Sequence, residues 1–136
     1  MGITDDAEFL EDLKKEFYAE SIEMLDACES ILMNLPAEAL NTENDPDIQD
    51  YLRKLHTMKG SAQAMSLKDM VKIIHTMETN ARNKNFTDLS LKVIDVLRKS
   101  VFYMENCEED KAYQIFSDVL GVLKKFNYTD PGGSDV

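Results

Sequence analysis

The sequence predicts an all-α protein of five helices, with an antiparallel up-and-down four-helix bundle at its centre. Apolar residues recur at helical spacing in five segments, and no segment alternates with a period of two for long enough to be a convincing strand. Gly and Pro are scarce, with five and three residues among 136, and they fall mainly in the predicted loops. The predicted connections are short, which favours antiparallel packing of successive helices.

The first predicted helix is the longest. It is expected to begin at Thr4, because a hydroxyl can cap a helix and the acidic Asp5 and Asp6 suit its positive end. A proline-containing loop is expected from 34 to 46. The inner face of this helix is predicted from apolar residues spaced seven apart, which are Leu10, Phe17, Met24 and Ile31.

The other four helices follow in quick succession. The second is expected from about Asp47 to Ala64, and Ser66 is expected to cap the third. Polar residues around 83–87 and 106–110 mark the next two turns, and the fifth helix is predicted to reach Phe126. We therefore expect one domain over residues 1–128 and a disordered tail over 129–136.

Charge excludes some classes of partner. The net charge of −11 gives the chain no general attraction for nucleic acid or an anionic membrane. From Arg53 to Lys72, however, five basic residues face one acidic residue, so this segment carries +4. A basic patch on an acidic protein predicts a partner with an acidic docking surface.

Cysteine content bears on the cellular compartment. No signal peptide and no apolar run of bilayer length is evident in the sequence. Cys28 and Cys107 are expected to be small core residues in a reducing compartment, and a disulfide between them is the alternative. These features favour the cytoplasm.

His56 is the first candidate for chemistry, and it lies within LRKLHTMKGSAQAMSL. Its position predicts a place at the edge of the buried stripe, on the same helix face as Lys59 and Gly60. Glycine inside a helix costs about 1 kcal/mol of stability relative to Ala, so the presence of Gly60 calls for an explanation. One explanation is that it clears space beside His56 for another protein's active site.

An imidazole can attack phosphorus when one ring nitrogen carries the proton and the other is free. A carboxylate accepting a hydrogen bond from Nδ1–H would hold the ring of His56 in that form. His75 and Glu78 lie one turn apart on the third helix. If the second and third helices form a hairpin, Glu78 can supply the carboxylate, and Lys59 can balance the charge of an attached phosphoryl group.

Simpler interpretations remain open from the residues alone. A histidine on a helix is usually an ordinary polar residue, and Gly60 could instead permit close helix packing. His56, His75 and Glu78 could also converge on a metal ion, although bundle di-metal sites usually need more carboxylates. A third possibility is an adaptor that keeps the fold without using His56.

The segment His56-Thr-Met-Lys59-Gly60-Ser-Ala62 closely resembles the signature of histidine-containing phosphotransfer domains. It is most similar to the N-terminal phosphotransfer domain of CheA-type chemotaxis histidine kinases. The likeness extends to IIHTMET, with His75 and Glu78, and upstream to FYAESIEMLDACESILMNL. The family often has glycines where this chain has Gln63 and Ser66, which puts the identity of the partner in question.

The resemblance implies a phosphoryl carrier in bacterial two-component signalling. His56 would be the phosphoacceptor, supported by Lys59, His75 and Glu78, and a partner would bind across Arg53, Gly60 and Gln63. The partners would be a histidine kinase catalytic domain and a response-regulator receiver domain, whose aspartate accepts the phosphoryl group. The chain has no Gly-rich nucleotide loop, so we expect no kinase activity and no cofactor of its own, with Mg²⁺ on the partner.

Overall fold

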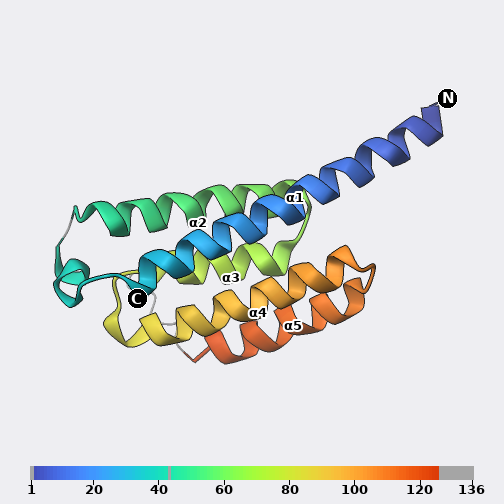
Figure 1. Ribbon diagram of the computed structural model, residues 1–136. Helices are drawn as coiled ribbons and strands as arrows, with labels where there is room; N and C mark the ends of the chain where they lie inside the picture. Colours follow the sequence, from blue (N-terminus) through green and yellow to red (C-terminus); the bar gives the residue numbers. More distant parts are fainter. Residues whose placement is uncertain (1, 43, 126–136) are drawn as a thin grey trace, which may run out of the picture.

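The computed structural model describes residues 2–42 and 44–125. The part of the chain it describes contains helices and no strand, so the predicted all-α class with five α-helices is confirmed. In chain order the elements are α1 (Gly2–Met33), the 3₁₀ helix η1 (Ala37–Asn41), α2 (Pro46–Ala64), α3 (Lys68–Thr79), the 3₁₀ helix η2 (Lys84–Phe86), α4 (Thr87–Glu105) and α5 (Glu109–Leu123) (Figure 1).

The helices form a closed arrangement around one core. Helix α1 packs against α2 and α4, α2 packs against α3, and α5 packs against both α3 and α4. Figure 1 shows α1 to α4 running alternately up and down, as predicted, while α5 runs beside them parallel to α3. Helix α5 packs mainly against α3 and α4, on the side of the bundle away from the outer face of α2.

Each helix contributes one apolar face to the core. The largest fully buried side chains come from α1, α2, α3, η2, α4 and α5 and include Leu25, Tyr51, Ile74, Phe86, Ile94 and Phe116. Arg98 of α4 then ties the bundle together at its surface, because it donates to Asp26 Oδ1 at 2.9 Å and to Glu29 Oε1 at 2.5 Å on α1. Burial of the apolar faces drives this packing, and the ion pairs fix the register of α1 on α4.

Helix α1 is longer than the bundle that it joins, and its N-terminal part projects beyond the other helices (Figure 1). Phe9 is 63% exposed and Leu10 is 57% exposed, so the predicted inward position of Leu10 is wrong. The apolar stripe of α1 continues without a break to Leu10, but the neighbouring helices end before they reach this part of it. The predicted start at Thr4 is also wrong, because α1 begins at Gly2.

Ser66 does not cap α3, which contradicts the prediction. It has a φ of 61°, and it ends α2 instead. The amide of Ser66 donates to the carbonyl of Gln63 at 3.0 Å, and the amide of Leu67 donates to that of Ala62 at 2.9 Å. These two bonds form a Schellman motif, which requires a left-handed residue at this position. Glycine fits such a position without strain, so serine is an unfavourable choice here.

The predicted loop at 34–46 contains η1 and ends at a well-formed helix cap. The side chain of Asp45 accepts from the amides of Asp47 and Ile48, at 2.9 and 3.2 Å, and Pro46 occupies the first turn. This combination fixes the start of α2, one residue before the predicted Asp47.

The two cysteines occupy different environments. Cys28 is fully buried, as predicted. Cys107 is exposed in the turn between α4 and α5 with a φ of 59°, so its predicted core position is wrong. Both thiols are free.

Some expectations fall on undescribed parts of the chain. Phe126, the domain end at 128 and the tail over 129–136 all lie outside the described residues. Within the described ranges, no helix has the length and apolar character needed to cross a bilayer.

Candidate functional site

The candidate residues of α2 lie on its outer face. Leu55 and Met58 are buried and anchor the opposite face of the helix in the core. This orientation turns His56 outward, and its side chain is 77% exposed. Lys59, Gly60 and Gln63 follow His56 at intervals of three, four and seven residues, so they extend the same face toward the end of α2.

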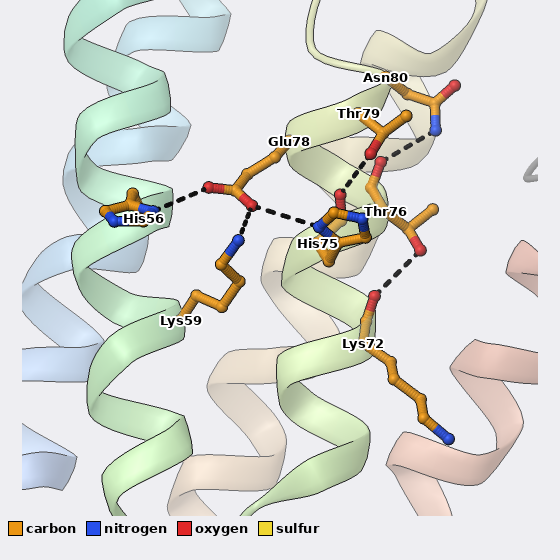
Figure 2. Close-up of polar contacts among 8 residues, drawn as sticks. All are labelled: His56, Lys59, Lys72, His75, Thr76, Glu78, Thr79 and Asn80. Carbon is orange, nitrogen blue, oxygen red and sulfur yellow. Dashed lines mark hydrogen bonds and ion pairs between the residues drawn. The ribbon is translucent and has the colours of Figure 1, made fainter. Parts of the chain in front are cut away.

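The turn at Ser66 brings α3 back beside α2, and this hairpin places Glu78 next to His56. Glu78 Oε2 lies 3.6 Å from His56 Nδ1, and Glu78 Oε1 accepts a hydrogen bond from Lys59 Nζ at 2.5 Å (Figure 2). Buried Met77, beside Glu78 on α3, fixes the rotation of that helix. The predicted neighbours of His56 on two helices are therefore brought together by the fold.

His75 approaches the same carboxylate from the other side. Its Nδ1 lies 3.7 Å from Glu78 Oε1, one helical turn away on α3. Glu78 thus faces three nitrogen-bearing side chains while being only 16% exposed (Figure 2). Because Lys59 is also largely covered, the Lys59–Glu78 pair is better shielded from solvent than a typical surface ion pair.

This arrangement distinguishes the two ring nitrogens of His56. The 3.6 Å separation exceeds an ordinary N–H···O hydrogen bond, so the attraction of Glu78 for Nδ1 is mainly electrostatic. A carboxylate facing Nδ1 favours the tautomer with the proton on that nitrogen. Nε2 then keeps its lone pair on a ring that is open to solvent, which is what a nucleophile needs.

Gly60 has no packing role within the described chain. A Cβ atom built on it would meet nothing within 4 Å, apart from its own helix backbone and chain neighbours. The interpretation that Gly60 permits close helix packing is therefore wrong. A glycine inside a helix costs stability relative to Ala, and no packing contact in the described chain accounts for Gly60.

The basic segment is less positive around His56 than its composition indicates. Asp50 lies just outside the segment and pairs with both Arg53 and Lys54, at 3.0 and 3.2 Å. Lys59 is compensated by Glu78. Because one Asp50 serves two cations, one positive charge remains near Arg53 and Lys54. Within the described ranges no ion pair is formed by Lys68 or Lys72 of α3.

Gln63 and Ser66 mark the far end of the α2 face. Both are exposed, and they line a hollow of about 370 Å³ together with residues of α3. A second hollow, of about 510 Å³, begins at His75 and continues between α3 and α5 to Leu120 and Leu123. Sequence reasoning missed this second hollow, because helical periodicity does not show that α5 packs against α3.

Sequence reasoning also missed the ion pairs of Asp50 with Arg53 and Lys54, although its spacing to these two residues on one helix indicates them.

The metal-binding alternative finds no donor set in the described ranges. No group of three or more His, Cys, Asp or Glu side chains is arranged there to hold a metal ion. His56, His75 and Glu78 share a network with Lys59, whose ammonium donates to Glu78 Oε1.

Comparison with known proteins agrees with the helical architecture. The family model described as Hpt domain matches residues 12–101, which is more than half of the chain and includes all of α2 and α3. Searches of curated proteins and of solved structures gave no match. The chain therefore belongs to the Hpt domain family, the helical phosphotransfer carriers of two-component signalling.

Proposed function

We propose that His56 is the phosphoacceptor of this domain and that Nε2 is the reacting nitrogen. The observation that carries the proposal is an exposed imidazole whose Nδ1 faces a carboxylate that is itself held by Lys59. His75 is exposed as well, but its Nδ1 faces the Glu78 oxygen that already accepts the Lys59 hydrogen bond. His56 instead faces Glu78 Oε2, to which no hydrogen bond is donated within the described chain. The space around Gly60, one turn further along α2, is open.

The loading step is a substitution at phosphorus. The Nε2 lone pair of His56 attacks the γ-phosphorus of ATP held by a histidine kinase domain, a P–N bond forms, and the P–O bond to ADP breaks. The imidazole becomes cationic as the bond forms, and Glu78 opposite Nδ1 stabilises that charge. Lys59 balances the negative charge of the phosphoryl group.

In the unloading step His56 is the leaving group, whereas in the loading step it is the nucleophile. A carboxylate oxygen of a receiver-domain aspartate attacks the same phosphorus, the P–N bond breaks, and Nε2 regains its lone pair. The Mg²⁺ that neutralises the phosphoryl oxygens belongs to the receiver, so this chain supplies position and a leaving group rather than a cofactor. It needs no kinase activity of its own.

The partner surface is proposed to centre on His56 and to include Arg53, Gly60 and Gln63. These residues share one exposed face of α2. A carrier must release its partner after each transfer, so a small and transient interface is expected. Because Asp50 compensates Arg53, charge alone adds little attraction at this end of the face.

The finer placement of the chain within its family is also a proposal. The sequence likeness around His56 and His75 favours a phosphotransfer domain of the CheA type, acting in chemotaxis signalling, with a boundary near residue 128 followed by a tail. Two free thiols, one of them exposed, suit the reducing cytoplasm.

The test is phosphorylation by histidine kinase catalytic domains with radiolabelled ATP, followed by mass spectrometry under alkaline conditions. We expect acid-labile label on His56, lost in His56→Gln and retained in the matched variant His75→Gln. Label that survives in His56→Gln, or that maps to His75, contradicts the assignment. Absence of label with every kinase, in a chain that still binds receivers, favours the adaptor alternative.

A further inference from the structure

The projecting part of α1 carries an apolar face with no partner in the described chain. We call residues 6–16 of α1 the arm; all of its side chains are exposed except Lys14, which is partly buried. Leu10 and Leu13 continue the stripe that becomes buried at Phe17, where the bundle begins. The arm thus presents to solvent the same face that the rest of α1 presents to the core.

The arm is also acidic. It contains five acidic and two basic residues, a net charge of −3. Asp6 lies one turn before Leu10, and Glu16 lies one turn after Leu13, so carboxylates border the apolar face at both ends. An isolated helix of this length is marginal in water, so a packed face would add to its stability.

A groove whose apolar floor and basic side chains complement the apolar, acidic arm lies beside α3. The two hollows beside α3 adjoin at Val71 and Lys72, which line both, and together we call them the α3 groove. Its floor is apolar, with Leu67, Val71, Leu120 and Leu123, and its lysines are Lys68, Lys72 and Lys124. Helix geometry gives a length of about 15 Å for the arm and about 14 Å for the stretch from Leu67, just before α3, to Thr76 within it.

Arm and groove begin at the same end of the bundle. Figure 1 shows α1 leaving the bundle at the end where α2 turns into α3. Two copies placed end to end about a two-fold axis would each lay an arm along the other's groove. Such a contact is isologous and closes on itself, as expected for a dimer of identical chains.

We propose that this chain forms a symmetric dimer in which the arm of each copy packs into the α3 groove of the other. The arm is an acidic amphipathic helix and the groove is apolar with a basic rim, so the two match as a helix and its groove do. Within the described ranges neither Asp6, Glu16, Lys68 nor Lys72 forms an ion pair, which leaves these charges available for the contact. His56 and Lys59 lie on the outer face of α2 and do not line the groove, whereas Gln63 and His75 lie at its edge.

The experiment is sedimentation velocity of the full chain across a concentration series. We expect a dimer in the wild type and a monomer in the Leu10→Glu/Leu13→Glu variant. The matched control is Met33→Glu, which changes an exposed apolar residue at the opposite end of α1 and should leave the dimer intact. Circular dichroism establishes that all three chains are folded.

A charge swap identifies the surfaces. Asp6→Lys/Glu16→Lys and Lys68→Glu/Lys72→Glu should each shift the equilibrium at least tenfold toward monomer, because like charges then face each other. Mixing the two variants should restore association, since reversed arm meets reversed groove in one of the two contacts. A wild type that is monomeric throughout overturns the proposal, as does a dimer indifferent to the arm variants. Loss of the dimer in the arm variants without any effect of the groove lysines overturns the assignment of the groove.

Discussion

Lys59 and Glu78 are joined by a 2.5 Å hydrogen bond from Nζ to Oε1, although they are separated by 19 positions and lie on different helices. This contact is the link between α2 and α3 at the candidate site. It fixes the carboxylate opposite His56 and balances a negative charge that would otherwise be unpaired in a partly covered position.

The first prediction concerns the acceptor of this bond. Glu78→Gln keeps the shape of the side chain but removes the charge facing Nδ1. We expect the Nε2–H tautomer of His56 to gain population, and phosphorylation to slow about tenfold, which is about 1.4 kcal/mol in the barrier. Imidazole ¹⁵N chemical shifts and the rate of labelling measure the two effects. Glu23→Gln on the exposed face of α1 is the control, and an unchanged tautomer ratio in Glu78→Gln removes Glu78 from this role.

The second prediction separates steric occlusion from helix stability. Gly60 and Gly121 are both helical, exposed and surrounded by open space. Replacing either by Arg should raise the free energy of unfolding by about 0.5–1 kcal/mol through helix propensity. Only Gly60→Arg should slow phosphotransfer to a receiver, by about 100-fold, because its side chain stands beside the reacting imidazole. Rapid-quench transfer as fast in Gly60→Arg as in Gly121→Arg would show that partners do not approach over this face.

The third prediction concerns the left-handed turn after α2. Ser66→Gly should raise the free energy of unfolding by about 1 kcal/mol, because glycine adopts a positive φ without the Cβ contact that serine suffers. Ser61→Gly, inside α2, should lower it by about 0.5 kcal/mol. Urea denaturation followed by circular dichroism measures both. A Ser66→Gly variant less stable than wild type would mean that the hydroxyl has a stabilising contact that outweighs the strain.

The fourth prediction concerns the two thiols. Burial raises the pKa of Cys28 to about 12, so its thiolate is scarce and also inaccessible in the folded chain. Cys107 is exposed in a turn. At about pH 8 we expect a thiol-reactive dye to label Cys107 alone, and to label Cys28 only after denaturation. Rapid labelling of both thiols in native conditions would show that α1 opens away from the core.

Much of this architecture could be predicted from the sequence, because apolar periodicity specifies which face of each helix turns inward. The same periodicity could not show where the bundle ends, since the stripe of α1 continues through Leu13 and Leu10 without a break. It also missed Ser66 as a helix end, because serine is common at helix starts and rare in a left-handed turn. Local spacing sufficed for the site, since a hairpin of adjacent helices needs only one turn to bring Glu78 beside His56.

The charge of the candidate site was less predictable. Counting residues between two positions ignores the carboxylates just outside the window, and here Asp50 cancels much of the charge of Arg53 and Lys54. Nor does a count reveal which lysines remain unpaired. Lys59 of α2 lies opposite Glu78, whereas Lys68 and Lys72 of α3 face no carboxylate within ion-pair distance in the described ranges, and this difference depends on how the two helices pack.

All candidate residues from Arg53 to Glu78 lie on the single hairpin of α2 and α3, which has a consequence for how the protein folds. Contacts within a hairpin close a short loop and therefore cost little chain entropy. Topologies rich in such local contacts fold quickly, whereas the docking of α1 on α4 has to join distant parts of the chain. The geometry of the candidate site is thus expected to form early in folding, and the other helices then dock to bury the inner face of the hairpin.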